Sequence, residues 1–332
     1  MPTPRVVVAG GGGFIGGALV ALFRERGDVD VRAIDIKPLD QWYQRFDDVE
    51  NVVADLRLRE QCQRAAEGAD DIYQLACDMG GMGFIENNKA ACMLSVLINT
   101  HMLEAARDHS VSRFFYSSSA CVYNGDKQEG YDNAPLREED AYPALPEDGY
   151  GWEKLFSERM CRHFREDFDL RTRIARFHNV YGPHGTWDGG REKAPAAICR
   201  KVIEAQANGS NRIEIWGDGN QVRSFTYIDD CTYGIGRIMD SDIEDPINLG
   251  SSETVTINDL VDLVEQIAGV ELKRDYKLDA PRGVDGRSSD NTRILAELDW
   301  EPSTRLRDGM ERTYRWIQEQ FTARAEGREH VA

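Results

Sequence analysis

The stretch Val6-Val-Val-Ala-Gly-Gly-Gly-Gly-Phe-Ile-Gly-Gly17 decides the fold. A short β-branched run leads into glycines spaced three apart, at 10, 13 and 16, and Phe14–Arg24 then has helical periodicity. A strand, tight loop and helix of this kind present backbone N–H groups to a pyrophosphate at the start of the helix. Six glycines lie among the 18 uncharged residues between Arg5 and Arg24, and each costs a helix about 1 kcal/mol, so the segment is neither a membrane span nor a signal helix.

Asp35 follows the next apolar run, Val31–Ile34, and lies 19 residues after Gly16. A carboxylate at this position binds the adenosine ribose hydroxyls and repels a 2′-phosphate. A glycine-rich turn with no ligand is the alternative for the loop taken alone. Together, the loop and Asp35 predict a dinucleotide site that prefers NAD to NADP.

Short apolar runs recur along the first half of the chain and alternate with amphipathic stretches such as Asn88–Arg107. The further runs are Val52–Ala54, Ile72–Leu75 and Arg113–Tyr116. This alternation predicts an α/β fold with a doubly wound parallel sheet.

The pattern loosens after about residue 176, and helices are expected near 257–268 and 308–320. We therefore expect a dinucleotide-binding domain at 1–176, rejoined by about 224–250. A second, smaller, mixed α/β substrate domain is expected to comprise 177–223 and 251–332.

The 332 residues include 40 Lys and Arg against 58 Asp and Glu, a net charge of −18. Nucleic acid and anionic membranes are poor partners for such a chain, so a phosphate-bearing ligand should be small and locally bound. The seven cysteines include no CxxC pair, which argues against a disulfide framework and a zinc site. These features favour a protein of the reducing cytoplasm with no metal.

Tyr150-Gly-Trp-Glu-Lys154 places a tyrosine and a lysine on one face of a helix. A neighbouring ammonium stabilises a phenolate and lowers the pKa of the tyrosine, which makes a base of it. The alternative is a chance surface pair. Ser117–Tyr123 follows the fifth apolar run, and a hydroxyl at the carboxyl end of a strand lies where doubly wound sheets bind ligands.

The glycine loop, the Ser119–Tyr150–Lys154 set and the chain length resemble the extended short-chain dehydrogenase/reductases that act on nucleotide sugars. Within that superfamily the sequence is similar to the GDP-mannose 3,5-epimerase family from about residue 5 to 320. The motifs that carry this resemblance are Asp78–Phe84, Ser118–Cys121, Arg176–Pro183, Gly190–Ala197, Trp216–Gln221 and Gly286–Asn291.

The resemblance implies a Rossmann fold, NAD as cofactor and GDP-mannose as substrate, and it implies roles for particular residues. The catalytic residues would be Ser119, Cys121, Tyr150, Lys154 and Lys193. The cofactor-binding residues would be Gly10, Gly13, Phe14, Ile15, Gly16, Asp35, Asp55, Leu56, Tyr150 and Lys154. The substrate-binding residues would be Gly80, Ser119, Cys121, Asn179, Glu192, Lys193, Ala194, Lys201, Gln221, Arg223 and Arg287, with Arg287 on the pyrophosphate.

In the implied reaction, Tyr150 takes the proton of the sugar 4-hydroxyl while NAD⁺ is reduced. The 4-ketone acidifies the 3- and 5-positions, which Cys121 and Lys193 invert from opposite faces before the 4-position is reduced again. The products would be GDP-L-galactose and GDP-L-gulose. The plainer interpretations are a buried structural cysteine at 121 and a solvated lysine at 193.

A 4-epimerase without a Cys–Lys pair is the nearest alternative activity. A 4,6-dehydratase would carry an acidic pair after position 121, where this chain has Val122 and Tyr123. A non-catalytic NAD-binding sensor would not need Ser119, Tyr150 and Lys154. The helices expected at 88–107 and 150–167 resemble the pair through which this superfamily forms homodimers.

Overall fold

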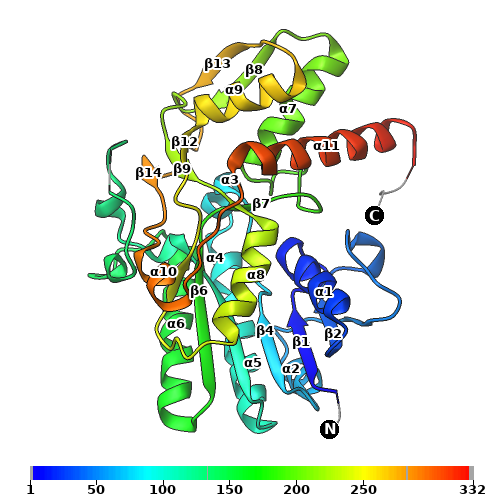
Figure 1. The fold of residues 1–332 in the computed structure, drawn as a ribbon, viewed down its shortest axis with the longest axis vertical. Coiled ribbons are helices and arrows are strands. Elements are labelled where there is room, and N and C mark those ends of the chain that lie inside the picture. Colours follow the sequence, from blue (N-terminus) through cyan, green and yellow to red (C-terminus); the bar gives the residue numbers. More distant parts are fainter. Residues whose placement is uncertain (1–2, 133, 282, 329–332) are drawn as a thin grey trace.

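Seven parallel strands form the main sheet, in the order β11-β6-β5-β4-β1-β2-β3 (Figure 1). The computed structural model describes residues 3–132, 134–281 and 283–328. The strands are β1 (Arg5–Ala9), β2 (Asp30–Asp35), β3 (Glu50–Val53), β4 (Asp71–Gln74), β5 (Arg113–Ser119), β6 (Arg171–Phe177) and β11 (Ile247–Leu249). The strand order reverses beside β1, which has β2 on one side and β4 on the other, and the carboxyl ends at such a point form the ligand-binding crevice of doubly wound sheets.

Helices cover both faces of the sheet. One face carries α1 (Phe14–Arg26) and α8 (Ile228–Met239), which contact each other. The other carries α2 (Arg59–Ala66), α5 (Ser95–Asp108) and α6 (Tyr150–Phe168), which pack in that order. Short helices α3 (Met82–Asn87) and α4 (Lys89–Met93) lead into α5, and single 3₁₀ turns occur at η1 (Leu39–Gln41), η2 (Ala120–Val122), η3 (Gly125–Gln128) and η4 (Glu138–Ala141).

The side chains of β1 show why this strand is apolar along its whole length. Val6 and Val8 belong to the core cluster on the α1 side, whereas Val7 and Ala9 belong to the cluster on the α5 side. Successive side chains of a strand point to opposite faces, so a strand covered on both faces needs apolar residues at every position. The predicted doubly wound parallel sheet is confirmed.

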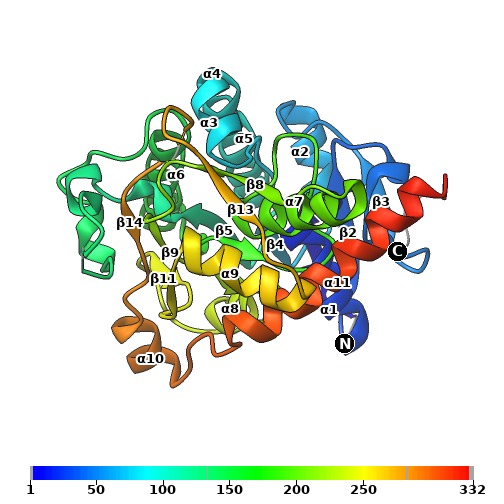
Figure 2. The same cartoon turned by 90° about the horizontal axis from the view of Figure 1, so that it is seen from above.

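A second unit lies above the carboxyl ends of the strands (Figures 1 and 2). Its helices are α7 (Ala194–Asn208), α9 (Ile257–Ala268) and α11 (Leu306–Ala325), whereas α10 (Thr292–Leu298) packs against β11 of the main sheet. Its short strands are β7 (Val180–Tyr181), β8 (Arg212–Trp216), β9 (Val222–Ser224), β10 (Thr226–Tyr227), β12 (Thr254–Thr256), β13 (Lys273–Lys277) and β14 (Gly286–Arg287). They form three small sheets, β10-β7, β12-β9-β14 and β13-β8. After β10 the chain returns to the main sheet through α8 and β11.

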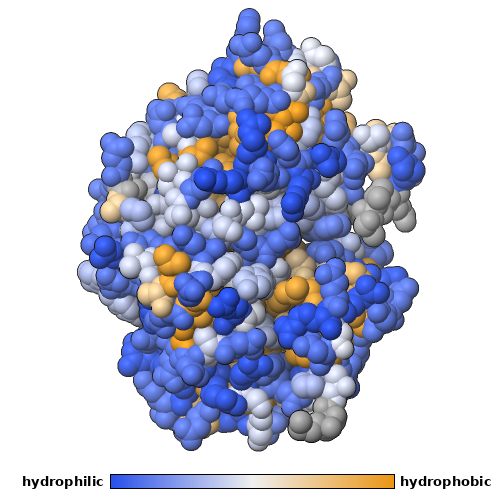
Figure 3. Space-filling view, viewed as in Figure 1, coloured by the Kyte–Doolittle hydropathy of each residue, from blue (hydrophilic) through white to orange (hydrophobic). Residues whose placement is uncertain are grey.

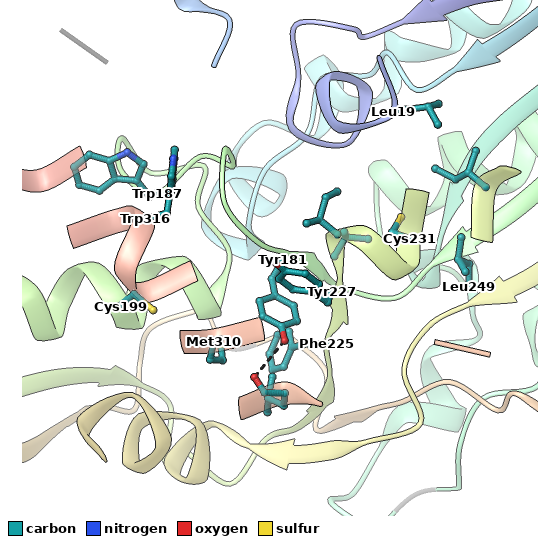
Figure 4. Close-up of a cluster of buried hydrophobic side chains, with 14 of the residues drawn as sticks. Leu19, Tyr181, Trp187, Cys199, Phe225, Tyr227, Cys231, Leu249, Met310 and Trp316 are labelled. Atoms are coloured by element: carbon teal, nitrogen blue, oxygen red, sulfur yellow. Dashed lines mark hydrogen bonds between the residues drawn. The ribbon is translucent and has the colours of Figure 1, made fainter. Parts of the chain in front are cut away.

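A buried aromatic cluster joins the two units (Figure 4). Tyr181 and Tyr227 stack edge to face with ring centroids 5.6 Å apart, and Met310 of α11 lies in the same cluster. The Tyr181 hydroxyl donates to the carbonyl of Leu306 at 3.3 Å, which satisfies its polar end. This continuous core holds α11 against the main-sheet unit, so the cleft between the units has a fixed wall.

Two elements differ from their predicted bounds. β5 runs on to Ser119, so the three serines belong to the strand instead of following it. The helix expected over 88–107 is broken at Leu94, where the chain tightens and the Leu97 N–H bonds the Leu94 carbonyl at 3.1 Å. The break coincides with a tertiary contact, because the next residue, Ser95, accepts a hydrogen bond from the Asp78 N–H at 2.9 Å.

The surface seen in Figure 3 is largely hydrophilic, with separate hydrophobic patches. None of the helices in the described ranges is long and apolar enough to cross a membrane. The seven cysteines are all free thiols, and six of them are buried.

A seam of buried polar groups ties β5 to α6. Ser118 Oγ and the Arg176 guanidinium both donate to Glu158, whose two oxygens lie 2.9 and 2.8 Å from the Arg176 nitrogens. The Arg176 and Glu158 side chains are 3% and 4% exposed, so neither charge can be solvated if the other is removed. A buried charge without its partner is strongly destabilising.

We predict that Glu158→Ala lowers the free energy of unfolding by about 3–5 kcal/mol, because it leaves the Arg176 charge buried and unpaired. Urea denaturation followed by circular dichroism measures this. Glu166→Ala, which removes an exposed carboxylate paired with Arg162 on the same helix, is the matched control and should cost less than about 1 kcal/mol. Equal costs for the two variants would contradict the prediction.

Candidate active site

A cleft of about 590 Å³ opens at the carboxyl edge of the sheet, between the two units. The main-sheet unit contributes the loop after β1, the ends of β2 and β5, and the segment after β4; the second unit contributes α7 and α11. Its lining includes the following predicted site residues: Gly10, Gly13, Phe14, Ile15, Gly16, Asp35, Asp55, Leu56, Ser119, Tyr150 and Lys193.

The glycine loop is tightly folded against its own backbone. Gly10 has a φ of +87°, which favours glycine, and a Cβ at Gly16 would lie 2.0 Å from the Gly10 carbonyl oxygen. Gly13 caps the N-terminus of α1, and a Cβ there would have only Gly10 and Asp35 within 4 Å. The loop therefore leaves the start of α1 open to a ligand, as a pyrophosphate requires.

Asp35 ends β2 and is largely buried at the edge of the cleft. Its Oδ1 accepts the Lys37 N–H at 3.0 Å, whereas its Oδ2 would lie 3.9 Å from a Cβ at Gly13. Asp55 pairs with Arg57 at 2.7 Å, and Leu56 is buried beside it. These residues and the glycine loop fit a dinucleotide: an open helix N-terminus for the phosphates and a carboxylate for ribose hydroxyls.

Ser119, Tyr150 and Lys154 converge where β5 meets α6. Ser119 is the last residue of β5, Tyr150 is the first of α6, and Lys154 lies one turn further on. The Lys154 Nζ donates to the Ser117 carbonyl at 2.9 Å and lies 5.5 Å from the centroid of the Tyr150 ring. Tyr150 and Ser119 line the cleft, while Lys154 is buried behind them.

Burial dominates the acidity of Tyr150. It raises the pKa of Tyr150 well above its ordinary value, and nearby Cys77, Cys121 and Glu153 add to the effect; hydrogen bonding with Ser119 acts in the opposite direction. The lowering that the sequence led us to expect from Lys154 does not prevail here. The Lys154 ammonium stands over the ring and is hydrogen-bonded to a backbone carbonyl.

Cys121 and Lys193 lie close enough for their charges to interact. Cys121 follows Ser119 in η2, and Lys193 is the residue before α7, in the second unit. Burial raises the pKa of the Cys121 thiol and lowers the pKa of the Lys193 ammonium, so it favours the neutral form of each. Lys193 lines the cleft together with Tyr150, whereas Cys121 is buried outside the cleft lining and interacts electrostatically with both.

Two arginines predicted to bind substrate lie near Cys121, Arg287 buried and Arg223 half-buried. Arg223 and Arg287 stand opposite each other in the paired strands β9 and β14. Arg287 donates from Nη1 to the Cys121 Sγ at 3.3 Å and from Nε to Gln128 at 2.6 Å. Arg223 donates to backbone carbonyls, with its Nη2 2.5 Å from the Val284 oxygen.

The remaining predicted substrate residues are more dispersed. None of them lines the cleft itself, and neither do Cys121, Arg223 and Arg287. Gly80 packs against the Phe84 ring, and Asn179 bonds the Ser224 carbonyl. Glu192 pairs with Arg200, and the Lys201 Nζ donates to the Glu214 carbonyl at 3.0 Å. Ala194 opens α7, and Gln221 is buried with its Oε1 without a hydrogen-bond partner.

Sequence reasoning missed three features of the site. Thr313 and Trp316 of α11 line the cleft from a distant part of the chain, and nothing in the local sequence signals this. Cys77 also lines the cleft beside Tyr150. Glu147 lies only three residues before Tyr150 and forms an ion pair with Arg287 at 3.5 Å. Across the described ranges, no three His, Cys, Asp or Glu residues gather in a way that could hold a metal ion.

Comparison with known proteins agrees with this geometry. Residues 6–250 match the model of the NAD dependent epimerase/dehydratase family. The chain is 44% identical over 318 residues to a GDP-mannose 3,5-epimerase of Arabidopsis thaliana, covering 96% of this chain and 83% of that protein. It is 45% identical to GDP-mannose 3,5-epimerase 1 of Oryza sativa subsp. japonica, covering 96% and 82%. The crystal structure of a Thermotoga maritima UDP-glucose 4-epimerase has the same fold, with a TM-score of 0.85, 22% identity, and 96% and 99% of the two chains covered.

Proposed function

This chain belongs to the NAD dependent epimerase/dehydratase family, and we propose that it inverts the 3- and 5-positions of GDP-mannose through a transient 4-ketone. The products would be GDP-L-galactose and GDP-L-gulose. One observation supports the proposal most: Lys193 lines the cleft together with Ser119 and Tyr150, and it is close enough to the buried Cys121 thiol for their charges to interact. The relatives at 44% and 45% identity support the same substrate.

The loop at Gly10–Gly16 and the Asp35 carboxylate would hold NAD. When bound, NAD supplies reversible oxidation of the sugar 4-position, so the overall reaction involves no net redox change. The residues of this chain then have two tasks. They must move the proton of the 4-hydroxyl, and they must move protons at two carbons of the ring.

Tyr150 would accept and return the proton of the 4-hydroxyl. Its hydroxyl stands beside Ser119, whose hydrogen bond favours the phenolate, and the Lys154 ammonium supports it from behind. Burial makes this tyrosine a weak acid, and the hydrogen bond with Ser119 acts against that effect.

Cys121 and Lys193 would serve opposite faces of the ring. An inversion needs one group that removes a proton and another that delivers one, and a thiol and an amine can each take either of these tasks. A 4-epimerase would need no such pair, because its chemistry ends at the 4-position. The neutral forms of both groups are also the forms that a dry site tolerates best.

Arg223 and Arg287 would bind the diphosphate. One buried and one half-buried arginine lie on neighbouring strands in a chain whose net charge is −18, which supports a local cationic site for a small anion. A planar guanidinium fork matches a phosphate well.

We predict that GDP-mannose incubated with the protein and NAD⁺ in deuterated water gains deuterium at the 3- and 5-positions, as measured by NMR of the sugar. Tyr150→Phe should reduce incorporation at least 100-fold, because without the 4-ketone neither carbon is acidic. Cys121→Ala should also block inversion. Inversion at the 4-position alone would identify a 4-epimerase, no exchange would favour a sensor, and normal exchange in Cys121→Ala would make that residue structural.

We predict that Asp35→Ala weakens NAD⁺ binding at least tenfold, because a charged hydrogen bond to the ribose contributes about 1.5–3 kcal/mol. It should also narrow the preference for NAD⁺ over NADP⁺, since the 2′-phosphate is no longer repelled. Isothermal titration calorimetry measures both. Asp40→Ala, at an exposed carboxylate of the same region, is the control and should bind normally. Tighter binding of NADP⁺ than of NAD⁺ to the unchanged protein would contradict the prediction.

We also propose that the protein acts in the cytoplasm as a homodimer. The seven free thiols suit a reducing compartment. Large apolar side chains are exposed on α5 and α6, among them Leu97, Trp152 and Phe156, and a second copy could cover them. Light scattering should give twice the mass of one chain. In Phe156→Glu, the measured mass should shift toward that of a single chain. A single-chain mass for the unchanged protein at micromolar concentration would refute the dimer.

A further inference from the structure

Glu147 is a buried carboxylate that the proposed reaction leaves unused. It lies in the loop before α6, and its backbone N–H donates to the Cys121 carbonyl at 3.0 Å. Its Oε2 is 3.5 Å from Arg287 Nη2, while Nη1 of the same guanidinium donates to the Cys121 Sγ at 3.3 Å. One arginine thus bridges the thiol and the carboxylate.

Among the residues that the structure describes, the second oxygen of Glu147 has no hydrogen-bond partner. Oε1 is fully buried, and no described residue donates a hydrogen bond to it. The Glu147 side chain is 16% exposed and the Arg287 side chain 8%. Buried carboxylate oxygens are costly to leave without a donor. A carboxylate held in this way, against a proposed acid–base group, calls for a functional explanation.

Glu147 and Arg287 act on Cys121 with opposite sign. Burial raises the pKa of the Cys121 thiol and the charge of Glu147 raises it further, whereas the charge of Arg287 lowers it. The carboxylate also competes for the guanidinium that would otherwise stabilise the thiolate.

We propose that Glu147 is a positioning residue that keeps the Cys121 sulfur protonated by engaging Arg287 and by opposing a negative charge on the sulfur. The proposal rests on the proposed function for the importance of Cys121, but the coupling of the two residues does not. Glu147 need not touch substrate, since it acts through Arg287 and the thiol.

Several other groups surround Cys121 and have to be kept constant in any test. The hydroxyl of Ser119 faces Cys121 from β5. A charge on the Cys121 sulfur interacts with groups on α6, at the start of α7 and on β9. These are Tyr150, Lys193 and Arg223. Glu147 is the carboxylate in this set. Its neutralisation should therefore lower the pKa of the Cys121 thiol.

Alkylation of Cys121 by iodoacetamide tests the coupling without substrate, because only the thiolate reacts. In Glu147→Gln, which keeps the shape of the side chain, we expect Cys121 to react at least tenfold faster than in the unchanged protein at pH 7.5. Tenfold corresponds to a drop of one pKa unit, the lower end of what a neighbouring charge produces. Peptide mass spectrometry separates Cys121 from the other six cysteines.

Two comparisons exclude a general loosening of the fold. Asp148→Asn removes the next carboxylate along the chain, which is 74% exposed and pairs with Lys89, and it should leave the Cys121 rate unchanged. Cys77 of the same cleft should react at one rate in all variants. If Cys77 accelerates together with Cys121, or if the Cys121 rate does not rise in folded Glu147→Gln, the proposal is wrong.

Arg287→Met should change the rate of Cys121 alkylation in the opposite direction. This variant tests the proposal if Glu147→Gln does not fold. Loss of the guanidinium should slow alkylation of Cys121 at least tenfold; an unchanged rate would overturn the proposal. The pH profile of deuterium incorporation adds the functional readout. Glu147→Gln should move the limb that reports Cys121 to lower pH, whether the sulfur acts as acid or as base, whereas absence of exchange with accelerated alkylation would refute the proposed function and leave the coupling intact.

Discussion

The alignment of α6 along β5 is fixed by buried polar groups that must find partners. Three consecutive residues of β5 each bond a different residue of α6: the Tyr116 hydroxyl with Glu153, the Ser117 carbonyl with Lys154, and the Ser118 hydroxyl with Glu158. A slip of one residue would leave these groups unpaired in an apolar layer, at a cost of several kcal/mol. The same alignment puts Ser119, at the end of β5, beside Tyr150, at the start of α6. The position of these two cleft residues therefore depends on contacts deeper in the fold.

The sequence carried enough information for the main sheet because each of its signals is local. The glycine spacing, the apolar runs and the position of Asp35 each report on the backbone within a few residues, and the observed strands follow them. The errors arose where tertiary contacts override local preference. β5 continues through its three serines because β6 pairs with it up to Phe177, and the helix expected at 88–107 breaks next to Ser95, which is bonded to Asp78.

The sequence predicted those parts of the candidate site whose residues belong to one local motif. Tyr150 and Lys154 are four residues apart on one helix, so their placement follows from helix geometry once the helix is recognised. That Cys121 and Lys193 meet was inferred only from resemblance, because 72 residues separate them and no periodicity connects them. The contribution of α11 to the cleft wall and the contact between Glu147 and Arg287 depend on how distant segments pack, and a single sequence contains no signal for either.

Burial does more at this site than exclude water. It opposes charge on a thiol and on an amine alike, so Cys121 is favoured as the form that holds a proton and Lys193 as the form that can take one. Such a neutral pair avoids the desolvation cost of a buried ion pair and leaves both groups ready for opposite roles. The cationic groups nearby would disturb this balance, because Arg287 favours the thiolate. A carboxylate that pairs with this arginine, as Glu147 does at 3.5 Å, acts in the opposite direction on the thiol.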